Sequence, residues 1–397
     1  MFNKLGPGVL VAAAFIGPGT ITACTIAGVG FGYELLWAML LSILATIILQ
    51  EMSARVGVIT QKGLAEVIRE QLEVSWLRYF VMGAILSAIV IGNTAYEAGN
   101  ISGATLGLQV LMGENYTSIY PWIIGFIAFL LLYLGSYKTL EKVFISLVLL
   151  MSVSFLVTAI LTKPDIMEVL AGLLIPIIPK NSLINIIALV GTTVVPYNLF
   201  LHASLVREKW NSTDDLPSVR RDTFLSIGLG GLISMAIIIC AAAISSTEVE
   251  DALDLAKGLE PLYGQSAKYL MGIGLFAAGI TSAITAPLAA AYVASSCFGW
   301  NAKTTDLRFR IVWMVVLFIG VITLSFGMRP IAIIQFAQVA NGLLLPIIGI
   351  ILLWIVNKAS VLGNFKNSIW LNISAFIIII LVMVLGTKSI LNVFGIV

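Results

Sequence analysis

Two short stretches combine helix-breaking residues with small polar side chains inside apolar sequence. Gly17 to Thr20 reads Gly-Pro-Gly-Thr, and Gly191 to Asn198 reads Gly-Thr-Thr-Val-Val-Pro-Tyr-Asn. Proline has no N–H and blocks helical geometry one turn back. In lipid an unpaired backbone group costs several kcal/mol, so a break is tolerated only where it lines a cavity or contacts a substrate. Each break leaves free N–H groups at one helix end and free C=O groups at the other, which predicts a polar binding site.

Two titratable residues inside apolar sequence have the chemistry for proton transfer. Glu97 lies 19 residues after Arg78 and 17 before Glu114, about 28 Å and 25 Å of helix from these charged ends. A carboxyl at membrane depth is a functional-site candidate, as proton carrier or ion ligand; the alternative is a protonated structural Glu. His202 follows Pro196 by six residues and has an ordinary pKa suited to proton transfer, although a lone His is often structural. If their segments face each other, Glu97 and His202 form a relay.

Neutral and charged polar residues mark other positions in the apolar segments. Gln338 and Asn341 are hydrogen-bonding groups that either line a cavity or tie helices together. Glu51 and Arg55, one turn apart, predict an interfacial ion pair. Arg308 and Arg310 are expected to anchor the start of the ninth segment, with a vestibule role as the alternative.

The composition indicates an all-α polytopic membrane protein. The 397 residues are 59% hydrophobic and 11% charged, with a mean hydropathy of +1.05, whereas soluble domains are about 25% charged. The three cysteines are far apart in the sequence, so no disulfide or metal-thiolate pattern is present. The absence of a phosphate-binding loop argues against ATP-driven pumping. We expect no enzyme activity, no resident cofactor and no nucleic-acid partner; the partners are the lipid bilayer and a small solute, and the chain is expected to act as a monomer.

Eleven apolar segments are long enough to cross a hydrocarbon core of about 30 Å. Their approximate bounds are 7–32, 34–55, 79–112, 120–136, 139–162, 182–207, 223–245, 263–297, 307–327, 331–356 and 367–388. The start of the chain loosely resembles a lipoprotein signal ending at Cys24, but the apolar run continues to about Gly32, so we expect a retained, broken helix.

The distribution of basic residues predicts the orientation. With the N-terminus in the cytoplasm, six of the 22 basic residues fall outside, namely Lys163, Lys180, Lys257, Lys268, Arg329 and Lys388. The other basic residues fall in the cytoplasmic connections, as the positive-inside rule requires. We therefore expect a multi-pass protein of the cell inner (plasma) membrane with its N-terminus cytoplasmic and its C-terminus outside.

The two breaks fall near the membrane midplane, in the first and the sixth segments. This placement predicts a 5+5 inverted repeat, with repeat one at about 7–162, repeat two at about 182–356, and an extra helix at about 367–388. All of these belong to a single transmembrane domain, 1–397. The alternative is that Gly and Pro are simply frequent in membrane helices.

Several motifs in the same order resemble the NRAMP (natural resistance-associated macrophage protein) divalent-metal transporters. They are the broken first helix, Leu49 to Gly57, Glu97 to Gly99, Val195 to Val206, and Ala337 to Val339. The resemblance covers essentially the whole chain, and Val195 to Val206 is its most specific part. It implies a LeuT-like fold, with Glu97 at the family's proton-pathway Glu, His202 at its second His, and Gln338 at a residue that can complete the metal shell.

The chain departs from the family at its metal ligands. The family's Asp-Pro-Gly-Asn is Gly-Pro-Gly-Thr here, and its Met-Pro-His is Val195-Pro196-Tyr197. Without the thioether, the donors are oxygens and backbone carbonyls, which suit a hard or partly hydrated cation such as Mg²⁺ or Mn²⁺. Family members that carry magnesium also lack parts of this signature.

Three functions follow from these residues. We expect alternating-access transport of a divalent cation, either coupled to protons or without such coupling. The alternatives are a LeuT-like transporter of an amino acid or other small polar solute, bound by the unwound backbone of Gly17 to Thr20 with Thr192, Thr193 and Tyr197 completing the pocket, and a non-transporting receptor or channel. The expected substrate-binding residues are Gly17, Gly19, Thr20, Thr193, Val194, Val195, Tyr197, Gln338 and Asn341, of which Thr20, Val194 and Gln338 are candidate metal ligands.

Overall fold

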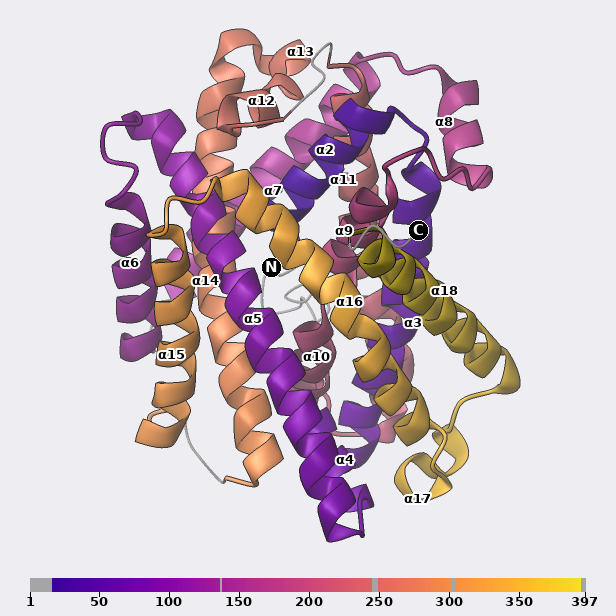
Figure 1. Cartoon of the computed structure of the whole chain (residues 1–397). Coiled ribbons are helices and arrows are strands. Elements are labelled where there is room, and N and C mark those ends of the chain that lie inside the picture. The colour runs from indigo at the N-terminus through magenta and orange to yellow at the C-terminus, as the bar shows by residue number, and fades with distance from the viewer. Residues whose placement is uncertain (1–15, 136–137, 245–248, 301–303, 394–397) are drawn as a thin grey trace.

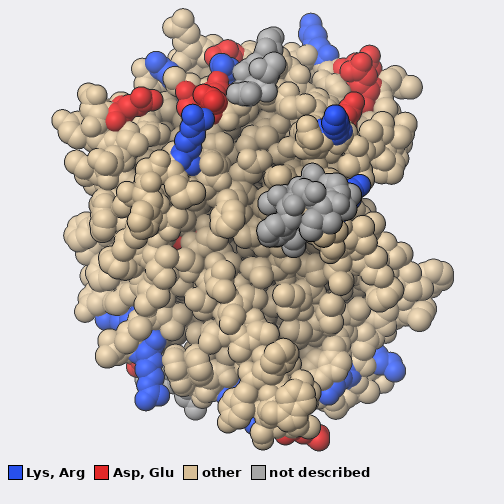
Figure 2. Space-filling model, in the orientation of Figure 1, with Lys and Arg blue, Asp and Glu red and all other residues tan. Residues whose placement is uncertain are grey.

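The protein is a bundle of long helices whose two ends carry most of its charges (Figure 1; Figure 2). The computed structural model describes residues 16–135, 138–244, 249–300 and 304–393. Nine helices in this part are long and apolar enough to cross a membrane, and two shorter apolar helices, α2 (Pro18–Phe31) and α6 (Tyr120–Leu134), accompany them. The all-helical membrane fold is therefore confirmed, while the count of eleven spans stays a prediction.

The long helices extend the predicted segments by several residues in places. They are α3 (Leu36–Thr60), α5 (Ser75–Met112), α7 (Lys138–Leu161), α11 (Leu216–Ala242), α14 (Ala267–Phe298), α15 (Leu307–Leu324), α16 (Pro330–Val356) and α18 (Ile369–Val393). The sixth segment is two helices, α9 (Leu183–Thr193) and α10 (Pro196–Lys209). Short helices that the apolar pattern did not predict lie in the connections: α4 (Leu64–Gln71), α8 (Ile166–Leu174), α12 (Ala252–Lys257), α13 (Glu260–Tyr263), α17 (Ala359–Leu362), and the 3₁₀ turns η2 (Thr213–Asp215), η3 (Gly264–Ser266) and η4 (Gly363–Phe365).

The helices pack in two groups. One group is formed by α5, α6, α14 and α15, and the other by α2, α3, α9, α10 and α11. Helix α16 contacts both groups, because it packs against α5, α9 and α2. Its backbone approaches α9 so closely that a Cβ on Gly191 would overlap the Gln338 carbonyl. The absence of a side chain at Gly191 thus brings Gln338 next to the end of α9.

The two ends of the bundle differ in their short helices (Figure 1). The α12–α13 end carries α8, α12, α13 and the last turn of α2; the α4–α17 end carries α4, α17 and the last turn of α10. The predicted Glu51–Arg55 ion pair is confirmed at the α4–α17 end, with 3.0 Å between Arg55 Nη2 and Glu51 Oε2. Arg310 lies near the same end, where its guanidinium is 4.3 Å from the centroid of the Tyr133 ring.

Candidate functional site

The sixth span is broken where the sequence predicts it. Helix α9 ends at Thr193 and α10 begins at Pro196. Val194 and Val195 between them have non-helical ψ angles of 74° and 120°. The end of α9 carries the partial negative charge of its last carbonyls, and the start of α10 carries the partial positive charge of its first N–H groups. Two helix ends of opposite polarity therefore meet at this break.

The described part of the first span begins at the predicted break. Gly17 is extended, with φ −114° and ψ −172°, and caps the start of α2 at Pro18. Its carbonyl accepts the first helical hydrogen bond, from the N–H of Ile21, at 3.2 Å. The upstream half of the predicted first segment lies outside the described residues. The described part of this break is therefore a buried helix start with the sequence Pro-Gly-Thr.

A direct hydrogen bond joins the two breaks. The hydroxyls of Thr20 on α2 and Thr192 on α9 are 2.8 Å apart, and both residues are fully buried. Thr193, one residue further along α9, points elsewhere: its hydroxyl donates to the Leu189 carbonyl at 2.8 Å and also contacts the Met39 sulfur at 3.7 Å. The sequence placed both threonines near a pocket, and the structure gives Thr192 the position facing the first break.

Gln338 on α16 is the third side chain at this junction. Its amide occupies the space that a Cβ on Gly19 would need, so the missing side chain of Gly19 admits it. Gln338 Nε2 donates to the Ile334 carbonyl at 3.3 Å, and Oε1 is buried without a hydrogen-bond partner in the described part of the chain. Asn341, one turn further on, lies instead against Gly92 of α5. Gln338 thus presents an unoccupied acceptor beside Gly19, and Asn341 belongs to the α5 contact.

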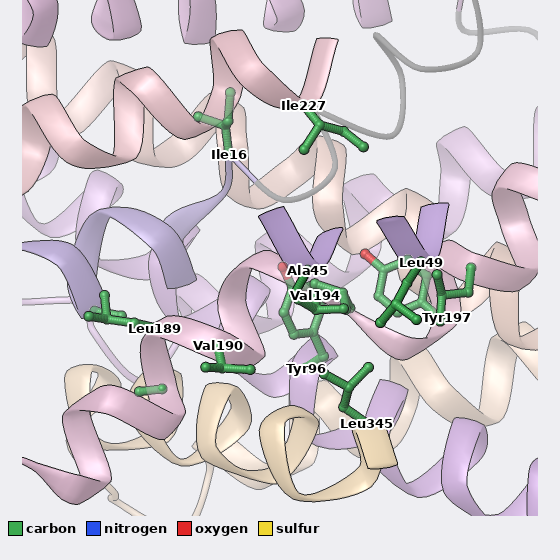
Figure 3. Close-up of a cluster of buried hydrophobic side chains, with 14 of the residues drawn as sticks. Ile16, Ala45, Leu49, Tyr96, Leu189, Val190, Val194, Tyr197, Ile227 and Leu345 are labelled. Carbon is green, nitrogen blue, oxygen red and sulfur yellow. The ribbon is translucent and has the colours of Figure 1, made fainter. Parts of the chain in front are cut away.

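Tyr197 closes the site on the side of α5. Its ring meets the Tyr96 ring edge to face, with 5.6 Å between centroids and an interplanar angle of 66°. Both rings are buried in the apolar cluster that also contains Val194 and Leu49 (Figure 3). Tyr197 therefore packs as an aromatic wall beside the break, and its ring is part of the core.

Glu97 is fully buried on α5, but it faces α15 of its own helix group and not the two breaks. Its side chain fills the space beside Gly320 of α15, and its Oε2 accepts a hydrogen bond from Asn100 at 3.2 Å. The second carboxyl oxygen has no partner in the described residues. Glu97 is thus placed between α5 and α15, where a carboxyl exchanging protons would have its second oxygen available.

His202 is also fully buried, and its partner is a residue of α3. Its Nδ1 lies 2.9 Å from Gln50 Oε1. His202 Nε2 and Gln50 Nε2 have no partners among the described residues, and neither side-chain polar atom of Asn198, one turn before His202, has one. The sequence reasoning missed Gln50 and Asn198. The four-residue spacing of Asn198 and His202, which puts them on one helix face, is the signal that points to Asn198.

The arrangement offers neutral oxygen donors to a small solute. Hydroxyls come from Thr20 and Thr192, an amide oxygen from Gln338, and main-chain carbonyls from the end of α9. Across the described ranges, no group of three or more His, Cys, Asp or Glu side chains is placed to hold a metal ion. Hard oxygen donors suit a hard cation that keeps part of its water shell, since Mg²⁺ dehydrates reluctantly.

Comparisons with known proteins found a matching family, a similar curated protein and solved structures of similar fold. The profile of the natural resistance-associated macrophage protein-like family matches residues 8–392. A Divalent metal cation transporter MntH from Klebsiella pneumoniae (strain 342) is 28% identical over 403 residues, which cover 96% of this chain and 92% of the relative. The fold resembles that of the Eremococcus coleocola manganese transporter, with a TM-score of 0.79 at 22% identity, covering 98% of this chain and 86% of the other. It also resembles MhsT, solved in complex with L-phenylalanine, with a TM-score of 0.61 at 16% identity, covering 96% and 98%.

Proposed function

The chain belongs to the natural resistance-associated macrophage protein-like (Nramp) family, and from this premise we propose that it is a secondary transporter that carries a hard, partly hydrated divalent cation such as Mg²⁺ or Mn²⁺. It is a multi-pass membrane protein with a LeuT-like fold. Transporters of this fold hold their cargo at broken helices near the midplane and expose it to each side in turn.

The observation that supports this proposal most directly is the 2.8 Å hydrogen bond between Thr20 and Thr192. It brings a hydroxyl from each broken span to one point, with the Gln338 acceptor close by on α16. A cation that enters between the two threonines replaces their mutual bond with two hydroxyl ligands. The carbonyls of Val194 and Thr193 belong to the negative end of α9 at the break and are candidate further ligands.

Uptake into liposomes tests the cargo. We expect the purified chain to take up Mg²⁺ or Mn²⁺, and both Thr20→Ala and Thr192→Ala to lower kcat/KM by about tenfold or more, because a hydrogen bond or ligand contact to a charged group contributes about 1.5–3 kcal/mol. Thr46→Ala is the matched control, since this buried hydroxyl donates only within its own helix, to Ser42 O at 2.7 Å. If an amino acid stabilises the protein against heat and no cation is taken up, the proposal of cation transport is wrong. That result would favour a small polar solute bound at the N–H groups of α2.

We also place a proton pathway at Glu97 and His202. One carboxyl oxygen of Glu97 and Nε2 of His202 have no hydrogen-bond partner among the described residues, which supports it. Glu97 contacts α15 and His202 contacts α3, so any relay between them runs through other groups. The test is Glu97→Gln in liposomes that contain a pH-sensitive dye. If Glu97→Gln changes neither the cation flux nor the acidification of the liposomes, transport is not coupled to protons through Glu97.

The orientation and the assembly state are part of the proposal. The N-terminus is cytoplasmic and the α4–α17 end faces the cytoplasm, which the basic residues Arg69, Arg78, Arg207, Arg220 and Lys358 at or near that end support. The chain acts as a monomer, because its two breaks lie within a single copy. Protease protection of the α12–α13 end in right-side-out vesicles would contradict this orientation.

A further inference from the structure

A cavity of about 390 Å³ lies at the α12–α13 end of the bundle. It forms where three elements meet: the last turns of α2, from Ile26 to Phe31, the start of α9 at Asn185, and the first turns of α16. All three elements lead inward to the junction of Thr20, Thr192 and Gln338. The cavity therefore lies at the α12–α13 end of the three helices that form the junction, and we call it the vestibule.

Most of the vestibule lining is apolar, and Asn185 and Gln335 are its two neutral polar residues. Gln335 Nε2 donates to Asn185 Oδ1 at 2.9 Å, which joins α16 to α9. Gln338 follows Gln335 by three residues, about 4.5 Å further along α16. A cation that passes the amide pair therefore meets another amide before it reaches the two threonines.

The mouth of the vestibule carries the two charged residues of its lining, Glu250 and Arg329. Arg329 Nη1 lies 3.3 Å from Glu250 Oε1, and the side chains are 78% and 61% exposed. Such an exposed pair contributes little to stability, so it opens and closes readily. The pair joins the segment before α12 to the start of α16, and both residues line the vestibule.

A carboxylate at this position has two possible partners of different charge. A divalent cation carries twice the charge of the guanidinium, and carboxylate oxygens are preferred ligands of hard cations. Arg329, being mostly exposed, can turn into solvent when it is displaced. Cation binding at Glu250 would then remove the bond to Arg329 and leave the cation at the entrance of the vestibule.

We propose that the Glu250–Arg329 pair is an outer gate opened by exchange, in which an external divalent cation takes the place of Arg329 on the Glu250 carboxylate and so enters the vestibule. This inference rests on the proposed cation transport. It adds a first cation-binding position, about nine residues or 14 Å along α16 from Gln338.

Thiol labelling tests the gate without transport. Ile26→Cys places a thiol that can be labelled in the vestibule lining. The three native cysteines are buried, so the unsubstituted chain measures the background labelling. We expect millimolar Mg²⁺ or Mn²⁺ to raise the labelling rate by a bulky hydrophilic maleimide several-fold. In Glu250→Gln and in Arg329→Gln the rate should be high from the start and insensitive to the cation. Ala332→Cys, also in the lining, serves if Ile26→Cys does not fold.

Two controls separate exchange from simpler effects. Choline chloride at matched ionic strength screens the charges of Glu250 and Arg329 without binding a carboxylate. Glu260→Gln removes an exposed carboxylate at the same end of the bundle that does not line the vestibule. Exchange predicts no rate increase with choline, and a full cation response in Glu260→Gln. An equal increase with choline, or a cation response that persists in Glu250→Gln, would overturn the proposal.

Uptake kinetics provide a second measurement. Because an exposed charge contributes about 0.2–1 kcal/mol, we expect KM for the external cation to rise about 1.4- to five-fold in Glu250→Gln and to fall by a similar factor in Arg329→Gln. Unchanged KM values in both variants would count against the gate. If the chain moves no divalent cation at all, the proposed function fails, and the labelling response still decides whether Glu250 binds one.

Discussion

The two ends of the helix bundle are fastened by different chemistry. At the α4–α17 end, the guanidinium of Arg55 is only 1% exposed and contacts three groups: the carboxylate of Glu51, the carbonyl of Phe365 at 2.5 Å, and Asn367 Oδ1 at 2.6 Å. Glu51 extends the network to Arg220 of α11 at 2.8 Å. This network ties α3 and α11 to the connection between α16 and α18.

At the α12–α13 end the corresponding contacts are exposed. Glu250 and Arg329 are both more than half exposed, and Lys257, paired with Asp254 at 2.6 Å, is 40% exposed. Breaking a buried charged contact leaves desolvated groups unpaired, whereas an exposed pair is replaced by water. The difference is that a buried charge network joins elements at the α4–α17 end, whereas the pair that joins elements at the α12–α13 end is exposed to water.

The largest expected effect comes from the same substitution at the two ends. Arg55→Gln should lower the free energy of unfolding by about 3–5 kcal/mol, because Phe365 O and Asn367 lose a buried charged donor. Arg329→Gln, the matched control, should change it by less than about 1 kcal/mol. Unfolding by SDS titration in mixed micelles measures both. Similar losses for the two variants would remove the distinction between the ends.

A smaller effect is expected for the amide that completes the buried network. Asn367 is 7% exposed, and its Nδ2 donates to Asn372 Oδ1 at 2.8 Å while its Oδ1 accepts from Arg55. Asn367→Ala should lower the free energy of unfolding by about 1–3 kcal/mol, since Arg55 keeps two of its partners. The exposed Asn211→Ala serves as a reference. A loss no greater than that of Asn211→Ala would show that the network is weaker than its burial indicates.

The smallest expected effect is a pH dependence at the α12–α13 end. Burial acts to raise the pKa of Asp254, but hydrogen bonds from Lys257 and from the N–H groups of Glu250 and Asp251 outweigh it and hold the pKa below the ordinary value of 3.8. A carboxyl with a lowered pKa stabilises the fold above its ordinary pKa and loses this contribution as the pH falls through the lowered value.

Hydrogen exchange of α12 checks this expectation. After correction for intrinsic rates, protection should stay constant from neutral pH down to about pH 5 and fall only below the ordinary pKa of Asp254. In Asp254→Asn the α12 amides should be less protected, with no dependence on pH. A loss of protection that begins between neutral pH and about pH 5 would contradict the assignment to Asp254.

Several features of the fold could be predicted from local sequence. The apolar segments, the break before Pro196, the helix start at Pro18 and the Glu51–Arg55 pair depend on neighbours within about one turn of helix, so local composition predicts them. The short helices α8 and α12 were missed, because they lie in connections where apolar length gives no signal. Their capping residues Asp165 and Asp251 were the available sign.

The site was predictable only in part. The sequence placed Thr20 and Gln338 at the junction, and the structure brings both there. It did not separate Thr192 from Thr193, which differ by about 100° around the axis of α9. It also did not identify Gln50 as the partner of His202.

The sequence by itself determined that this chain is a membrane-embedded helical protein with interrupted spans, because the bilayer penalises every unpaired backbone group and charge. The packing of α2, α9 and α16 decided which hydroxyls and amides meet, and it turned Glu97 toward α15. The physical reason is that helical periodicity fixes the direction of a side chain only relative to its own helix axis, and the rotation of one helix against another is set by side-chain contacts between residues distant in the sequence.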